Sequence, residues 1–131
     1  MNLFLDIDGT LIETQLFPRR TVVLKENVNY IKGIVGDEII DSITLLSFGL
    51  VGDAPFKYFM KEFGFIFTHF FNTDIKKVIY VDTLYLKGAT KREMFLHASP
   101  DFGHSMFFDD TLKKEYEAVK CSRFEKELFK V

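Results

Sequence analysis

The sequence predicts an α/β protein, a three-layer sandwich around a mostly parallel central sheet. Two observations favour this class. Short apolar runs alternate along the chain with segments whose apolar residues have helical spacing. Three of the runs end at a polar side chain, because Asp6, Ser47 and Asp109 each follow one directly. No repeat, low-complexity segment or linker rich in Gly or Ser divides the 131 residues, so we expect a single domain over 1–131.

The first apolar run, Asn2–Leu5, predicts a buried strand, because it is too short for a helix and does not alternate apolar and polar residues. Gly9 suits a tight turn just after this strand, since glycine tolerates backbone geometry that other residues resist. In the next segment, 12–24, Pro18 excludes a continuous helix. We therefore expect a small hairpin or flap there.

The next segments read as a helix, a strand and a second helix. Residues 25–40 carry apolar side chains at mostly helical spacing, which predicts one amphipathic helix, and a break at Gly33 or Gly36 stays open. Ile43–Leu46 is the second predicted strand. Pro55 suits the first turn of the second helix, and Gly64 is its expected end.

Two apolar runs follow in the middle of the chain. Phe65–Phe71 predicts a strand, and Val78–Val81 a strand or hairpin arm. Which of the two lies in the main sheet stays open. Lys91–Ala98 then predicts a helix that stops before Pro100.

The last part of the chain is predicted in less detail. Met106–Phe108 reads as a strand, and Leu112–Val119 has the composition of a helix. For Ser122–Val131 two readings stay open: one last helix, or a strand followed by a helix.

Composition bounds the class of protein. Seventeen basic and 19 acidic residues give a net charge of −2, which does not indicate nucleic acid as a partner, although a local basic patch stays open. A single cysteine, Cys121, excludes an internal disulfide framework. No run approaches a membrane span, and Asp6 and Asp8 interrupt the first apolar stretch, so we expect neither a signal peptide nor a membrane partner. A soluble, cytoplasmic protein is expected, and 16 Phe make a homodimer worth testing.

Acidic side chains follow two of the predicted strands, and the carboxyl ends of parallel strands share one edge of a sheet. Asp6, Asp8, Asp109 and Asp110 would then repel one another, which a bound divalent cation relieves. Oxygen ligands select a hard cation, and Mg²⁺ with some of its waters is the natural choice. The sequence therefore predicts a magnesium site at this edge.

A hydroxyl and a lysine complete the expected site. Ser47 follows a strand, and either Lys87 or Lys91 lies nearby. With the metal they would form a receptor for a dianionic phosphoryl group, so a phosphorylated substrate is expected. One carboxylate would attack phosphorus, and a second, displaced by two residues, would transfer protons.

Four segments carry a resemblance to a known family. DIDGT at Asp6–Thr10 resembles the first motif of the haloacid dehalogenase superfamily of phosphatases. Ser47 after ITLL is similar to the second motif, and Lys91 stands where the third-motif lysine would be. FFDD at Phe107–Asp110 resembles the acidic fourth motif. The four segments stand in the family's order along the chain.

The resemblance implies a role for each of these residues. Asp6 would be the nucleophile and a metal ligand, and Asp8 the general acid/base, whose backbone carbonyl would bind the metal. The residues that bind the phosphoryl group would be Ser47, Lys91 and Thr10. The other metal ligands would be Asp109 and Asp110, the latter directly or through water. Two points stay open: the separate roles of Asp109 and Asp110, and whether Lys87 or Lys91 is the active-site lysine.

The resemblance also implies a Rossmann-like fold and bears on substrate size. Family members usually carry a cap between the first and second motifs or between the second and third. Here the gaps 11–44 and 48–90 are filled by the predicted flap, helices and strands, so we expect a small member without a cap domain. Capless members tend to act on large substrates, so a macromolecular substrate is among the expectations.

Two other functions compete with the phosphatase. A receiver-like phospho-acceptor domain also combines acidic residues, a Ser or Thr and a Lys. Its phosphorylated Asp stands alone mid-chain, and no lone Asp ends a middle strand ahead of Ser47. A catalytically idle binding module with the same fold is the other alternative.

Overall fold

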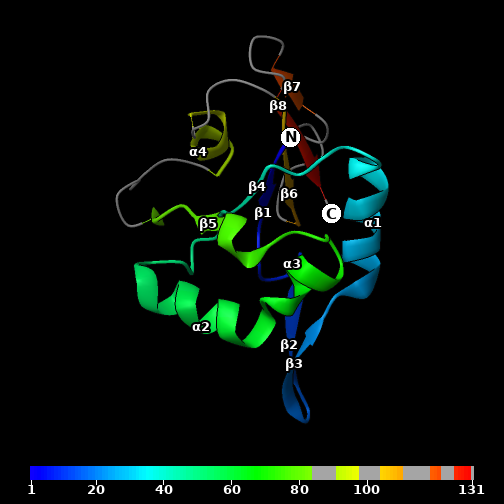
Figure 1. Ribbon diagram of the computed structural model, residues 1–131. Coiled ribbons are helices and arrows are strands. Elements are labelled where there is room, and N and C mark those ends of the chain that lie inside the picture. Colours follow the sequence, from blue (N-terminus) through cyan, green and yellow to red (C-terminus); the bar gives the residue numbers. More distant parts are fainter. Residues whose placement is uncertain (84–90, 98–103, 111–118, 122–125, 131) are drawn as a thin grey trace.

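The computed structural model describes residues 1–83, 91–97, 104–110, 119–121 and 126–130. Within these ranges the protein is α/β, with a mostly parallel sheet flanked by helices (Figure 1). The sheet has six strands in the order β5-β4-β1-β6-β8-β7. Their bounds are β1 Asn2–Leu5, β4 Ser42–Leu45, β5 Val78–Tyr80, β6 Ser105–Asp109, β7 Val119–Cys121 and β8 Lys126–Lys130.

The order of the strands determines where a ligand would bind. β1 pairs in parallel with both β4 and β6, and β5 and β8 extend the parallel sheet on either side. β7 pairs antiparallel with β8 at one edge. Counted along the chain, the parallel strands lie in the order 3-2-1-4-5, as in doubly wound sheets. The order reverses between β1 and β6, and ligands of such sheets bind beyond the strand ends at that point.

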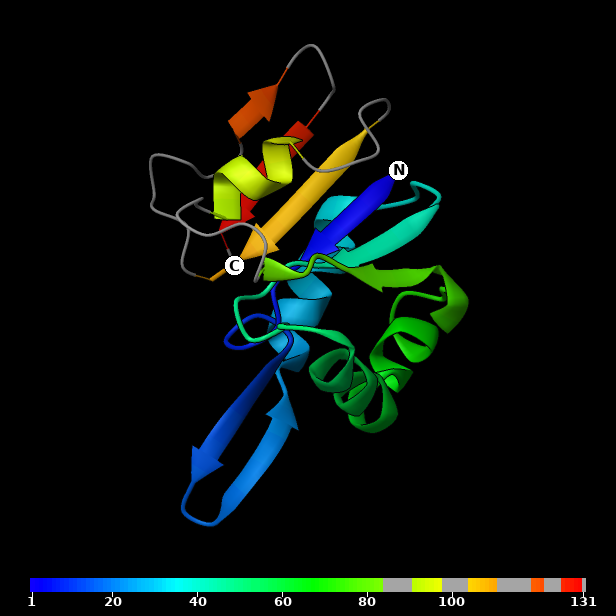
Figure 2. The same cartoon turned by 90° about the vertical axis from the view of Figure 1, so that its left-hand side faces the viewer.

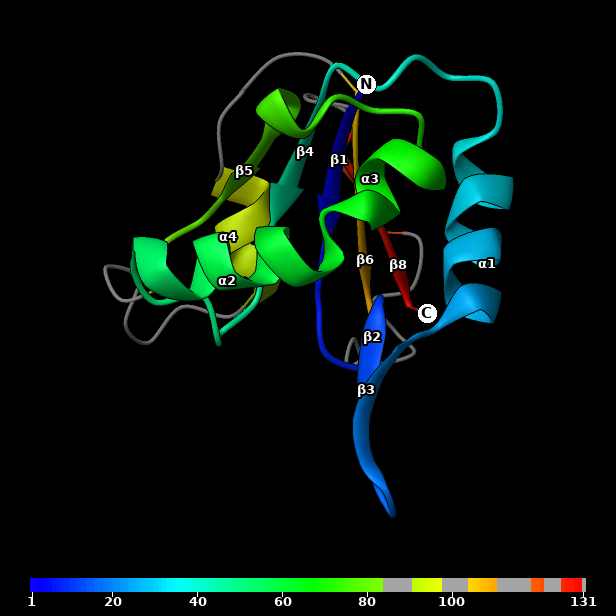
Figure 3. The same ribbon diagram turned by 60° about the horizontal axis from the view of Figure 1, so that its bottom comes forward.

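Helices flank this sheet (Figure 3). Side chains alternate along a strand, so Leu3 and Leu5 of β1 face one side and Phe4 the other. The first side packs against three helices, and Phe4 packs edge-on against Phe95 of α4, with ring centroids 4.9 Å apart. Burying a side chain of this size contributes about 1.5–3 kcal/mol. The helices are α1 Lys25–Val35, α2 Asp53–Phe63, α3 Phe65–His69 and α4 Lys91–His97, with a 3₁₀ turn at Ile75–Lys77.

The flap predicted within 12–24 is a β-hairpin of β2, Ile12–Leu16, and β3, Arg19–Val23. It projects from the body of the molecule at the end where β1 finishes (Figure 2). Its tip is exposed, whereas Ile12 at its base is buried in the main core. The hairpin therefore stands beside the carboxyl edge of the sheet.

The first two helices confirm the predictions over most of their length. α1 ends at Val35 instead of reaching residue 40, because Gly36 takes a positive φ of 60° that ends the helix. α2 begins at Asp53 and ends before Gly64, as expected. Gly64 passes so close to the carbonyl oxygen of Met60 that a Cβ would collide with it.

The predicted strand over Phe65–Phe71 is wrong, because the segment begins with the short helix α3. Ile66, Phe67 and Phe71 are buried against the core, whereas Phe65 is half exposed. An apolar run this short does not distinguish a strand from a helix by its periodicity, and packing against α2 decides the outcome. The run Val78–Val81 provides β5, so it is this run, and not Phe65–Phe71, that lies in the main sheet.

The tail differs from both predictions for Ser122–Val131. Lys126–Lys130 forms β8, which pairs in parallel with β6. A strand thus ends the described chain where a helix was expected, since pairing with a distant strand overrides local composition. Of the predicted helix Leu112–Val119, residues 112–118 lie outside the described ranges, and Val119 begins β7.

The predicted helix Lys91–Ala98 and the strand Met106–Phe108 are confirmed as α4 and β6, although Ala98 lies outside the described ranges. Among the described residues, no helix is both long enough and apolar enough to cross a membrane.

Candidate functional site

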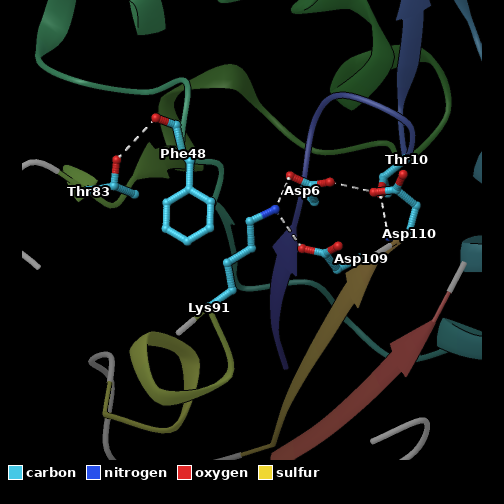
Figure 4. Close-up of polar contacts among 7 residues, drawn as sticks. All are labelled: Asp6, Thr10, Phe48, Thr83, Lys91, Asp109 and Asp110. Carbon is cyan, nitrogen blue, oxygen red and sulfur yellow. Dashed lines mark hydrogen bonds and ion pairs between the residues drawn. The ribbon is translucent and has the colours of Figure 1, made fainter. Parts of the chain in front are cut away.

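Two aspartates meet where the strand order reverses. Asp6 follows β1 directly, and Asp109 is the last residue of β6 (Figure 4). The parallel pairing of the two strands continues past β1, since the backbone N–H of Asp6 donates to the carbonyl oxygen of Phe108 at 3.0 Å. Both carboxylates are buried. The pairing thus brings together two acidic groups that are far apart in the sequence.

A lysine bridges these two carboxylates. The Nζ of Lys91, the first residue of α4, lies 3.0 Å from Oδ1 of Asp6 and 2.9 Å from Oδ2 of Asp109. Its side chain is 13% exposed, whereas those of the two aspartates are 3% and 0% exposed. Removing one partner from such a buried pair leaves an uncompensated charge. The structure places Lys91 at this position, and Lys87 lies outside the described residues.

Thr10 connects the turn after β1 to the end of β6. Its hydroxyl donates to Oδ2 of Asp6 at 3.2 Å and accepts the backbone N–H of Asp110 at 3.1 Å. The side chain is fully buried. Thr10 therefore orients two of the acidic residues, and its predicted contact with a phosphoryl group stays a prediction.

The turn itself requires glycine at position 9. Gly9 has a φ of 79°, and a Cβ built on it would overlap the carboxylate of Asp110. Asn27 of α1 holds the turn from the other side, since its Nδ2 donates to the carbonyl oxygen of Gly9 at 3.1 Å. The turn can therefore approach the acidic cluster closely only without a side chain.

The cluster carries more negative than positive charge. Burial, together with the charge of Asp109, raises the pKa of Asp6 to about 7, although Lys91 opposes the shift. Burial alone would lower the pKa of Lys91, but its hydrogen bond to Asp109 and the nearby carboxylates outweigh this, so its pKa lies above the ordinary value. One ammonium group therefore does not fully balance the buried carboxylates.

The acidic residues fit a divalent cation. Asp6, Asp109 and Asp110 each offer a carboxylate oxygen, and these oxygens all lie within 4.8 Å of one another. Oδ1 of Asp110 is buried and has no hydrogen-bond partner among the described residues. Such an orphaned oxygen and an excess of negative charge suit a hard cation that keeps some of its waters.

Ser47 and Asp8 lie together around a neighbouring pocket. The backbone N–H of Leu46 donates to the carbonyl oxygen of Leu5 at 2.9 Å, which extends the β1–β4 pairing to Leu46, directly before Ser47. Ser47 is buried, whereas Asp8 is exposed. Both line a pocket of about 460 Å³. The side chain of Asp8 is not in the acidic cluster, and the role of its backbone carbonyl as a metal ligand stays a prediction.

Three residues near the site carried no signal in the sequence. The ring of Phe48 lies over Lys91, with 5.2 Å between the ring centroid and Nζ, a distance at which a cation–π contact forms. Thr83 holds the backbone of Phe48 through a hydrogen bond of 3.4 Å to its carbonyl oxygen (Figure 4). Asn27 is the other residue, and an Asn within an amphipathic helix belongs to no motif.

The fold and the site define an α/β protein with a mostly parallel sheet flanked by helices and a lysine-bridged acidic cluster at the point where its strand order reverses. No protein-family model matches the chain, and neither a curated protein nor a solved structure matches it. The functional argument therefore rests on the geometry of the site.

Proposed function

We propose that the protein is a Mg²⁺-dependent phosphomonoester hydrolase of the haloacid dehalogenase type, which acts through an aspartyl-phosphate on Asp6. One observation carries the proposal: Lys91 lies within 3.0 Å of both Asp6 and Asp109 at the carboxyl edge of the sheet. A buried carboxylate can act as the nucleophile toward a phosphoryl group. The fixed ammonium group beside it balances the negative charge of that phosphoryl group.

In the first step, a carboxylate oxygen of Asp6 attacks phosphorus while the bond from phosphorus to the leaving-group oxygen breaks. Asp8 is exposed on the adjacent pocket and donates a proton to that oxygen. Lys91 balances the charge of the phosphoryl oxygens, and the Ser47 hydroxyl donates to one of them. The products are the free alcohol and an acyl phosphate on Asp6.

In the second step, Asp8 takes a proton from a water molecule, which attacks phosphorus. The bond between phosphorus and the Asp6 oxygen breaks, inorganic phosphate leaves, and both aspartates return to their first state. Asp8 suits this alternation because it is exposed beside the pocket and can reach the water.

Asp6, Asp109 and Asp110 would hold the metal ion. Bound Mg²⁺ supplies the positive charge that lets a dianionic phosphate approach these carboxylates. The turn around Gly9 and Thr10 keeps Asp6 and Asp110 in place for this role.

In this proposal the fold is a three-layer sandwich without a cap domain, and the β2–β3 hairpin flanks an open site. The strand order argues against the receiver-like alternative. Receiver domains share the flavodoxin-like order 2-1-3-4-5, whereas the parallel strands here follow 3-2-1-4-5.

The test is hydrolysis of p-nitrophenyl phosphate with Mg²⁺ by the full chain and by Asp6→Asn. The variant is expected to fold, as judged by circular dichroism, and to lose at least about 1,000-fold in kcat, because a neutral amide does not attack phosphorus. Asp37→Asn, an exposed position after α1, is the matched control and should keep full activity. Full activity of Asp6→Asn would overturn the proposal.

A further inference from the structure

A pocket of about 460 Å³ opens beside the acidic cluster, between the base of the β2–β3 hairpin and α2. Figure 3 shows these two elements on the same side of the molecule, near the end of β1. Asp8 and Ser47 line the pocket from the strand ends. These are the residues to which the proposed mechanism assigns the leaving-group proton and a phosphoryl oxygen. A leaving group bonded to that phosphorus would therefore enter this pocket.

Most of the other residues that line the pocket have apolar side chains. Leu50 follows β4, and Phe59 and Phe63 lie on one face of α2; Leu50 and Phe59 are almost fully buried. The two rings lie 5.7 Å apart at a tilt of 32°. An apolar wall of this kind favours a flat apolar group over a sugar or a polyol. The volume is within the range of pockets that take small molecules, about 300–1,000 Å³.

The charged side chains that line the pocket are all negative. Among the described residues around the pocket, the charged side chains are Asp8 and Glu62, and both are acidic. Glu62 is exposed on α2, one turn from the exposed Tyr58. An anionic group on the leaving group would be repelled here, whereas an ammonium group would be attracted.

We infer that this pocket binds the leaving group of the substrate, and that the leaving group is an apolar ring that carries no anion and preferably carries an amine that faces Glu62. The inference rests on the proposed function for the position of the phosphoryl group. It narrows the expected substrates to small aryl phosphomonoesters, and it disfavours bisphosphates and phosphorylated carboxylic acids.

The kinetic test uses three phenyl phosphates that differ only at the para position: 2-aminoethyl, ethyl and carboxymethyl. Two methylene groups separate the ammonium from the ring and one separates the carboxylate from it, so the three phenols are similar leaving groups. The expected order of kcat/KM is amine above ethyl above carboxylate. Because Glu62 is exposed, we expect kcat/KM to differ by about two- to fivefold between the amine and the ethyl compound, and again between the ethyl compound and the carboxylate. An unordered series, or one led by the carboxylate, would overturn the inference.

Two variants test the side chains that this inference names. Glu62→Gln should abolish the preference for the amine over the ethyl compound, and Glu26→Gln, an exposed position on α1, should leave it unchanged. Tyr58→Lys adds a cation beside the pocket at a side chain that is 68% exposed, so the fold should tolerate it. It should shift the order toward the carboxylate. If the order stays the same in both pocket variants, the inference is wrong.

A binding test separates this inference from the proposed function. The free phenols (tyramine, 4-ethylphenol and 4-hydroxyphenylacetate) are titrated into the full chain by ligand-observed NMR, with and without Glu62→Gln. The same order of affinity is expected whether or not the protein turns over a phosphate. Ordered binding without any hydrolysis would support the pocket and overturn the proposed function. Hydrolysis without ordered binding or ordered kinetics would support the proposed function and overturn the inference about the pocket. If there is neither hydrolysis nor ordered binding, both the proposed function and the inference about the pocket are wrong.

Discussion

Lys91 and Asp6 are 85 positions apart in the chain, and their Nζ and Oδ1 atoms lie 3.0 Å apart in a part-buried ion pair. The same ammonium group contacts Asp109, so one cation connects β1, β6 and α4. This contact stabilises the fold and also prepares the proposed nucleophile. Its loss should therefore affect both stability and activity.

Lys91→Met is expected to destabilise the protein by about 3 kcal/mol at pH 8, because two buried carboxylates lose their shared counter-charge. The loss should be smaller at pH 5, where Asp6 takes up a proton. Urea unfolding at the two pH values measures both effects. Lys57→Met, an exposed position on α2, is the control and should change stability by less than about 0.5 kcal/mol. An equal loss at both pH values would contradict the charge argument.

The pH dependence of stability should report the raised pKa of Asp6. Burial raises this pKa from 3.8 to about 7, so the folded chain binds a proton that the unfolded chain releases. The stabilising contribution is complete below about pH 4 and is lost as the pH rises through about 7. Without metal, wild type should therefore lose stability relative to Asp6→Asn between these values. Urea midpoints of both proteins in EDTA measure the difference, and a constant difference would refute the shift.

Mg²⁺ should bind more tightly as the pH rises through about 7, because the ion must displace the proton that Asp6 holds below that value. Calorimetry in two buffers of different ionisation enthalpy measures both affinity and proton release. At 100 times its Kd, Mg²⁺ should stabilise the fold by about 2.7 kcal/mol.

Asp110→Asn is the matched variant for the metal site, because it keeps the size of the side chain and removes the charge of a carboxylate whose Oδ1 has no hydrogen-bond partner among the described residues. Its affinity for Mg²⁺ should fall at least about tenfold, in line with the loss of a ligand charge. Asp37→Asn should bind Mg²⁺ like wild type. Unchanged affinity in Asp110→Asn would exclude Asp110 as a ligand.

Two glycine substitutions should have opposite effects. Gly9→Ala forces a side chain into a φ of 79° and against the carboxylate of Asp110, so we expect a loss of at least about 1–2 kcal/mol and weaker Mg²⁺ binding. Gly33→Ala lies in α1, where the new Cβ meets no atom within 4 Å apart from its chain neighbours and the adjacent helix backbone, and it should stabilise the helix by up to about 1 kcal/mol. Thermal unfolding compares the two. If Gly9→Ala and Gly33→Ala change the stability equally, the turn at Gly9 tolerates a side chain and the prediction is wrong.

Local signals were enough to predict several of the elements and part of the site. An apolar run followed at once by Asp6 and a glycine turn indicates a strand end, and the structure has β1 and its turn there. Phe65–Phe71 was predicted wrongly because packing against α2 decides its conformation. Lys126–Lys130 was missed as a strand because its partner, β6, is distant in the sequence.

By itself, the sequence determined which chemical groups the site holds: carboxylates at Asp6 and Asp109, a hydroxyl at Ser47, and a choice of two lysines. Only the tertiary structure decided that Lys91 bridges the two aspartates and that Asp8 and Ser47 border a pocket whose charged lining residues are acidic. The physical reason is that local backbone preferences act over a few residues. Strand order and the packing of α2 and α4 set distances between groups that are far apart in the chain.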